Sequence, residues 1–157
     1  MAIDNYSGDD MYSALDIAKY IISKCNKENC PISNLQLQKI LYNLQKAFLQ
    51  SEIRITEKKS SALFGDEIEA WQWGPVVPSV YYVYCTYGSM SIIETYNVHI
   101  DARVQKFIDP IIERQRSVNP WRLVDETHRK GGAWDRVYRN GMGNRSVIPC
   151  ELIRTCG

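Results

Sequence analysis

Apolar residues recur at spacings of three and four along most of this chain, a period that predicts amphipathic helices rather than strands. The first such stretch begins near Asp10, where Asp9 or Asp10 is suited to cap it, and the polar run before Pro31 ends it. The predicted buried face comprises Ala14, Leu15, Ala18, Ile21, Ile22 and Cys25. We therefore expect a first helix that packs into the core.

The second helix has a stronger start signal. Ser33 and Gln36 have the spacing of a capping box, and Ile32 and Leu37 occupy the two positions of a hydrophobic staple. The buried face continues through Leu37, Ile40, Leu41, Leu44 and Phe48. The other faces are rich in amides: Gln36, Gln38, Asn43, Gln45 and Gln50. These amides either bond to water and backbone or form a polar groove that binds another chain.

Two short stretches alternate between polar and apolar residues, which is typical of half-buried strands. The first contains Ile53 and Ile55, and the second runs from Glu67 to Trp71. We expect them to pair as a small two-stranded β-ribbon beside the helices. Glu67 and Glu69 would share one face of it, and paired carboxylates can act as acid and base. Nothing else in this stretch supports catalysis, so a surface ribbon is the preferred interpretation.

The stretch Trp71–Pro78 interrupts the pattern with rigid backbone. Gly74 can adopt positive φ and Pro75 has a fixed φ, so a sharp turn is expected there. Pro78 suits the first position of a further helix, which Gly88 would end.

Trp71 and Trp73 flank this turn, and each is a candidate either for the core or for contact with a partner. In an extended strand the two indoles point the same way, unless the turn has begun by Gln72.

The second half of the chain returns to a helical period over residues 104–112, where Pro110 predicts either a kink or two abutting helices. Residues 89–101 fit an extended segment or a loop. Asn119 and Pro120 are suited to be the cap and first residue of another helix. Three further segments are expected, a short helix, an irregular glycine-rich stretch and a last helix: 133–138, 140–144 and 149–156.

Length and composition fit one mainly α domain, a helical bundle over residues 1–157 with its core at about residues 10–155. The hydrophobic fraction of 45 %, the charged fraction of 24 % and a net charge of +1 are ordinary for a soluble globular protein. The charge is uneven, however. Residues 103–157 hold eleven Lys and Arg against six Asp and Glu, a modest basic excess that is more typical of a solvated surface than of a nucleic-acid interface.

The five cysteines do not form a zinc motif, because neither Cys25 with Cys30 nor Cys150 with Cys156 has the spacing of a zinc knuckle. We expect no metal and no cofactor. No signal peptide and no apolar run long enough to span a bilayer is apparent, which favours a cytoplasmic protein with reduced thiols and no membrane partner.

Catalytic machinery is also not apparent. The chain has no Gly-x-Ser-x-Gly elbow and no His-Glu-x-x-His motif, and Gly141 and Gly143 do not continue into a phosphate loop. His128, next to Thr127, is expected to pack at a helix end and to bond a backbone carbonyl. The residues thus indicate a helical protein that is not an enzyme.

Three stretches together resemble the Panacea-domain family, which comprises SocA-like antitoxins and GepA-type phage-associated proteins. Residues 35–42, Leu-Gln-Leu-Gln-Lys-Ile-Leu-Tyr, are similar to the family's helical motif. Residues 63–81 resemble its most specific signature, and they contain Phe64, Glu69, Gly74, Pro75 and Pro78. Thr127-His128 followed by Trp134 matches its C-terminal element. The resemblance covers about residues 14–155.

This resemblance implies an antitoxin that neutralises a toxin encoded nearby through direct protein–protein binding. It also implies an alternative, because one studied member delivers its toxin to the ClpXP protease as an adaptor. A nucleic-acid-binding regulator is a further alternative that the basic excess alone supports. The candidate partner-binding residues are Gln38, Lys39, Tyr42, Trp71, Trp73, Tyr81 and Tyr84.

Overall fold

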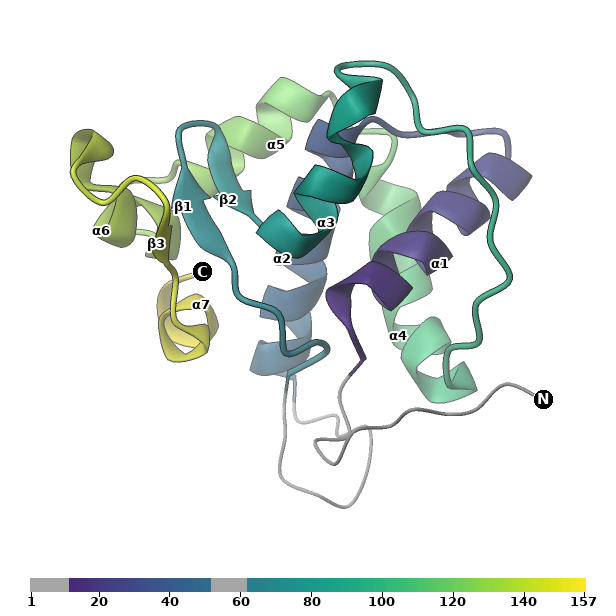
Figure 1. Cartoon of the computed structure of the whole chain (residues 1–157). Coiled ribbons are helices and arrows are strands. Elements are labelled where there is room, and N and C mark those ends of the chain that lie inside the picture. The colour runs from purple at the N-terminus through teal and green to yellow at the C-terminus, as the bar shows by residue number, and fades with distance from the viewer. Residues whose placement is uncertain (1–11, 52–61) are drawn as a thin grey trace.

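The computed structural model describes residues 12–51 and 62–157, and it shows the mainly helical chain with a small β-sheet that the sequence predicts (Figure 1). The helices are α1 (Ala14–Lys27), α2 (Asn34–Gln50), α3 (Pro78–Tyr84), α4 (Ala102–Gln115), α5 (Pro120–Thr127), α6 (Ala133–Tyr138) and α7 (Cys150–Cys156). The strands are β1 (Glu69–Trp71), β2 (Gly74–Val76) and β3 (Ser146–Val147), and short 3-10 turns lie at η1 (Cys85–Tyr87) and η2 (Arg139–Gly141).

Helix α2 is the central element of the fold. The helices α1, α3, α4, α5 and α7 and the strand β2 all pack against it (Figure 1). Its apolar face is completely buried, including Leu37, Ile40, Leu41, Leu44 and Phe48. Burying a side chain of this size stabilises the fold by about 2 kcal/mol. The capping box predicted for Ser33 and Gln36 is present at its start.

Local signals fix most of the other helix boundaries. Pro78 is the first residue of α3, and Gly88 follows η1 with a φ of 58°. Asn119 caps α5 by accepting a hydrogen bond from the Trp121 N–H, and Pro120 begins that helix. Pro110 lies inside the single helix α4. The 89–101 segment contains no helix.

One predicted cap is wrong. The side chain that caps α1 is Ser13, which accepts a hydrogen bond from the Asp16 N–H, and the helix begins at Ala14 instead of near Asp10. Asp9 and Asp10 lie outside the described residues.

The sheet also differs from the predicted ribbon. Strand β1 is the middle strand of an antiparallel sheet with the order β2-β1-β3, so both of its edges are occupied. Ile53 and Ile55, the predicted partners of Glu67–Trp71, lie outside the described residues, and the strands that pair with β1 in this structure are β2 and β3. Glu69 pairs with Val76 on one side and with Val147 on the other. Strand β3 is distant from β1 in the sequence and only two residues long, so a local pattern of alternating residues does not predict it.

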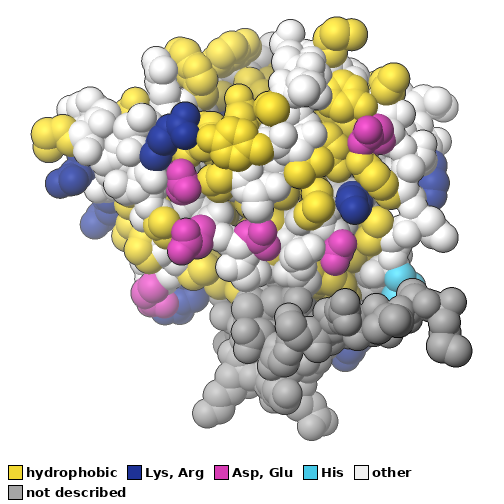
Figure 2. Space-filling view, viewed as in Figure 1, with side chains coloured by type: hydrophobic (Ala, Val, Ile, Leu, Met, Phe, Trp, Pro, Cys, Tyr) yellow, Lys and Arg dark blue, Asp and Glu magenta, His cyan; other side chains and the backbone are white. Residues whose placement is uncertain are grey.

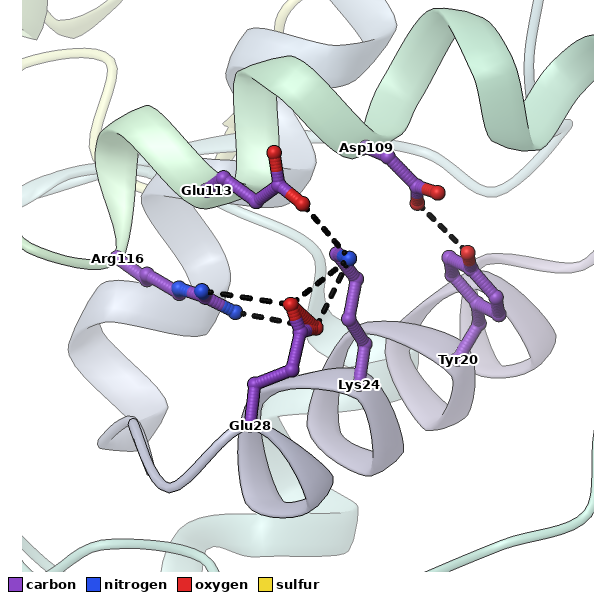
Figure 3. A network of polar contacts seen from close by, with 6 residues as sticks. All are labelled: Tyr20, Lys24, Glu28, Asp109, Glu113 and Arg116. Carbon is purple, nitrogen blue, oxygen red and sulfur yellow. Dashed lines mark hydrogen bonds and ion pairs between the residues drawn. The ribbon is translucent and has the colours of Figure 1, made fainter.

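Helices α1 and α4 are joined at their surface by a polar network (Figure 3). Its members are Tyr20, Lys24, Glu28, Asp109, Glu113 and Arg116. The Lys24 ammonium lies 2.9 Å from a Glu28 oxygen on its own helix and 3.0 Å from a Glu113 oxygen on α4. The Tyr20 hydroxyl donates to Asp109 over 2.6 Å. Pairs at this degree of exposure each contribute about 0–1 kcal/mol, so the network aligns the two helices more than it stabilises them.

A buried amide holds the segment that enters the sheet. Gln45 of α2 is fully buried, and its Nε2 donates to the Phe64 carbonyl over 2.8 Å. Its Oε1 accepts from the Leu63 N–H over 2.9 Å and from the Phe64 N–H over 3.3 Å. One side chain therefore satisfies the backbone of two consecutive residues, next to the single β-bridge that Phe64 forms with Tyr12. Among the described residues, no helix is long and apolar enough to cross a membrane.

We expect the Gln45→Leu variant to lose roughly 3 kcal/mol of unfolding free energy, because two N–H groups and one carbonyl become buried without partners. Gln50→Leu is the matched control on the same helix, since Gln50 is exposed and donates only to the Arg154 carbonyl. It should change the unfolding free energy by less than about 0.5 kcal/mol. Urea denaturation measures the unfolding free energy of both variants. If Gln45→Leu and Gln50→Leu lose the same amount, the Gln45 hydrogen bonds do not hold Leu63 and Phe64 in place.

Candidate functional site

A buried lysine lies where α2 meets the β1–β2 hairpin. Lys39 has no exposed surface, and its ammonium donates to the Pro75 carbonyl over 3.0 Å. A Cβ atom at Gly74 would lie 2.7 Å from this ammonium and 2.8 Å from the Thr127 hydroxyl. Gly74 also has a φ of 112°, a conformation that favours glycine. Glycine alone combines the missing Cβ atom with a ready adoption of this positive φ.

Burial lowers the pKa of Lys39 to about 7. A protonated amine loses much of its hydration at such a site, and within residues 12–51 and 62–157 no carboxylate pairs with this one. In the described part of the chain, the Pro75 carbonyl is the one hydrogen-bond acceptor of this ammonium. Lys39 therefore changes its charge near neutral pH instead of remaining a fixed cation.

The C-terminal motif residues lie on the other side of Lys39. Thr127 ends α5, and its hydroxyl donates to the Val124 carbonyl over 2.8 Å. The next residue, His128, stacks on the Trp134 ring with centroids 3.8 Å apart and an interplanar angle of 3°. The Trp134 indole N–H donates to the Trp71 carbonyl over 2.7 Å. Helices α5 and α6 are thereby fixed to the hairpin.

His128 packs at the end of α5 as predicted, but the expected bond to a backbone carbonyl is not formed. Its Nε2 is buried and has no hydrogen-bond partner among the described residues. Burial lowers the pKa of His128, and the nearby Lys39 lowers it further. A neutral imidazole suits the flat stack on Trp134, because the charged form would be poorly solvated there.

The three motif stretches therefore meet in one buried cluster, which we call the Lys39 junction: Lys39, Gly74, Pro75, Thr127, His128 and Trp134. Sequence comparison identifies these residues as motifs, but only folding brings them together. Phe64 and Glu69 lie beside it with local roles. The Phe64 backbone bonds to Gln45, and the Glu69 carboxylate accepts from the Trp71 indole N–H over 3.0 Å.

The four glutamines of α2 that the sequence analysis singles out bond to the protein's own backbone, and Asn43 bonds to the Gln115 side chain. Gln38 is 2 % exposed, accepts from the Val77 N–H over 2.9 Å and donates to the Asn34 side chain over 3.0 Å. Asn34 in turn donates to the Tyr81 carbonyl. Among the predicted partner-binding residues, Gln38, Lys39, Tyr42 and Tyr84 are buried in this structure. Their contact with a partner stays a prediction.

The exposed residues of that set lie around the hairpin. The turn consists of Gln72 and Trp73. Because the turn has begun by Gln72, the indoles of Trp71 and Trp73 do not have to point the same way. Trp71 is consequently half-buried, whereas Trp73 is 52 % exposed. The Trp73 ring meets Trp121 of α5 edge to face, with centroids 5.5 Å apart, and Trp121 is 55 % exposed. The sequence analysis did not identify Trp121 as a surface residue. Its position in the first turn of α5, outside the narrow apolar face of that helix, is a signal that could have found it.

Trp71 belongs to a second aromatic group. Its ring lies 4.9 Å from Tyr81 and 6.0 Å from Tyr82, measured between centroids. The Arg145 guanidinium lies 4.4 Å above the Trp71 ring and donates to the Tyr82 hydroxyl over 3.1 Å. Figure 2 shows hydrophobic side chains gathered over the hairpin and α3.

A groove of about 520 Å³ runs between the hairpin, α2 and α3. We call it the aromatic groove and define it by Trp71, Trp73, Tyr81 and Arg145, which line it together with Leu35. No carboxylate lines it among the described residues. Apolar walls with a few polar groups are typical of a binding site. The five cysteines are free thiols, and the described part of the chain contains no group of three residues that could hold a metal ion.

The fold and this surface define a mainly helical protein in which motif residues form a buried junction and aromatic side chains line an external groove. The chain belongs to the family described as antitoxin SocA-like, Panacea domain, whose model matches residues 37–135. That match contains every residue of the Lys39 junction.

A curated relative supports this assignment. The chain is similar to the protein named antitoxin SocA of Caulobacter vibrioides (strain NA1000 / CB15N), with 31 % identity over 140 residues. The alignment covers 81 % of this chain and 70 % of the relative. No solved structure matches the chain.

The charge change of Lys39 should appear in the pH dependence of stability. Between pH 7 and about 8.5 the unfolded chain keeps the Lys39 proton while the folded chain has released it, so the unfolding free energy rises with pH. The contribution is at most about 1.4 kcal/mol per pH unit. We expect Lys39→Met to remove this part of the slope.

Lys106→Met makes the same substitution at an exposed position of α4 and should leave the slope parallel to that of the parent. Urea titrations at several pH values give the three slopes. Burial raises the pKa of Cys25 to about 11, but this thiol is present in all three proteins, so its effect on the slope cancels in the comparison. A Lys39→Met slope equal to that of the parent would contradict a titrating Lys39.

Proposed function

We propose that this protein is the antitoxin of a toxin–antitoxin pair and that it neutralises its toxin, without catalysis, by direct binding through the aromatic groove. The observation that carries the proposal is the Trp73–Trp121 pair. Two tryptophan side chains that are more than half exposed lie in edge-to-face contact beside this groove. The similarity to a protein named antitoxin supports the biological role.

The energetics of association favour such a surface. Binding energy at interfaces is concentrated in a few residues, with tryptophan, tyrosine and arginine enriched among them. Covering about 100 Å² of exposed indole on each tryptophan contributes roughly 2.5 kcal/mol. Trp73 lies in a two-residue turn that Gly74 and the Lys39 junction hold in place, so little conformational entropy is lost when a partner binds.

Neutralisation by binding can act in two ways, by covering the active surface of the toxin or by delivering the toxin to the ClpXP protease. Both begin with the same contact. The toxin's half-life in cells with and without ClpXP separates them, because only delivery shortens that half-life.

The basic excess of the last third is a weaker basis for a nucleic-acid function. Arg116 pairs with Glu28 and Arg154 with Glu151, and Arg136 donates to the Gly131 carbonyl. These cations already serve internal contacts.

We expect Trp73→Ala to abolish neutralisation of the protein encoded by the neighbouring reading frame while leaving the melting temperature nearly unchanged. An exposed side chain contributes little to folding, and truncation removes its contact area at the interface. Colony counts after co-expression measure neutralisation, and thermal denaturation of the purified variant measures stability.

Ile93→Ala is the matched control, because Ile93 is 77 % exposed and does not line the aromatic groove. This variant should neutralise like the parent. Two results would refute the proposal: a neighbouring protein that is harmless when expressed alone, or one that stays toxic beside the parent chain. Full neutralisation by Trp73→Ala would refute the assigned surface.

A further inference from the structure

A second cavity of about 570 Å³ lies on a different part of α2, between that helix, α5 and the end of α7. Carboxylates line this cavity together with cations, whereas no carboxylate among the described residues lines the aromatic groove, and no described tryptophan reaches the second cavity. Its volume is within the range of sites that hold small organic ligands.

Two hydrogen-bond donors that line this cavity have no acceptor among the described residues, whereas Arg129 donates to the Cys156 and Gly157 carbonyls. Tyr42 is 3 % exposed, and its hydroxyl is not bonded to any residue within 12–51 and 62–157. The half-buried Lys46, one helical turn further along α2, has neither an ion-pair partner nor a hydrogen-bond acceptor in the same ranges. Neither donor atom is buried without a partner in the way that His128 Nε2 is, so each is open to a ligand in the cavity.

Packing from α7 and α5 holds the cationic groups near one another. A Cβ atom at Gly157 would lie 2.8 Å from Cδ of Lys46, so the lysine stem is pressed against the end of α7. Arg129 donates to the Cys156 carbonyl over 2.9 Å, which fixes its guanidinium at the same edge of the cavity. Burial lowers the pKa of Lys46 and the positive charge of Arg129 lowers it further, while the negative charge of Glu126 opposes these two effects. An anion placed between the two would relieve this repulsion.

The other side of the cavity has acceptors. Asp125 and Glu126 of α5 line it, and Glu126 is 57 % exposed and 3.8 Å from Arg122. Carboxylates at this position can accept hydrogen bonds from hydroxyl groups. A ligand that carries an anionic group at one end and hydroxyls at the other matches both sides.

We propose that this cavity binds a small phosphorylated ligand of sugar-phosphate size. Lys46, Arg129 and the Tyr42 hydroxyl bind its phosphate, and Asp125 and Glu126 accept hydrogen bonds from its hydroxyls. Lysine and arginine are the usual phosphate-binding side chains. The proposal is independent of toxin binding, because none of these residues lines the aromatic groove.

The test is titration calorimetry of the full chain with ribose 5-phosphate, and with ribose and acetate at the same concentrations. We expect saturable binding of ribose 5-phosphate and none of ribose or acetate. Lys46→Gln should weaken the binding at least tenfold, and Tyr42→Phe should weaken it by a smaller factor. Lys106→Gln, an exposed lysine on α4, is the control and should bind like the parent.

Circular dichroism and melting temperatures confirm that each variant is folded before it is titrated. Three results would overturn the proposal: no saturable binding of ribose 5-phosphate, equal binding by Lys46→Gln and the parent, or acetate binding as tight as that of ribose 5-phosphate. The calorimetric titration does not involve toxin neutralisation, so a failure to bind ribose 5-phosphate can be told apart from a failure of the proposed function.

Discussion

The hydrogen bond from the Lys39 ammonium to the Pro75 carbonyl is the interaction on which the rest of this structure depends. It lies inside the protein, where a charged amine is costly, and it links the central helix to the hairpin over 36 residues of sequence. Gly74 makes the close approach possible, and Thr127 closes the site from α5. The family motifs thus mark a structural junction more than an external contact surface.

This junction explains how a short hairpin can present exposed aromatic rings in a fixed position. Isolated two-stranded hairpins are marginally stable in water. Here β1 is paired on both sides, its carbonyl at Trp71 accepts from Trp134, and Gln38 of α2 holds the backbone just after β2. The polar interior and the apolar surface are parts of one arrangement, since the buried donors immobilise the backbone that carries Trp73.

Much of the fold was predictable from the chain, because helix boundaries are set by residues a few positions apart. The capping box at Ser33, the helix starts at Pro78 and Asn119–Pro120, and the positive φ of Gly74 were all expected and are present. The pairing of β1 with β3 was not predictable, because the two residues of β3, Ser146 and Val147, are too few to show an alternation that would signal a strand. The surface role of Trp121 was missed for a related reason, since its neighbour Trp73 is distant in sequence.

The sequence by itself determined where most of the helices begin, which faces of the two long N-terminal helices are largely buried and to which family the chain is similar. Only the tertiary structure decided which polar residues of α2 are buried, that Trp73 is exposed, and that the three motif stretches meet around Lys39. The physical reason is the range of the interactions. Caps and backbone angles depend on near neighbours, whereas burial and hydrogen-bond partners depend on which distant segments pack together.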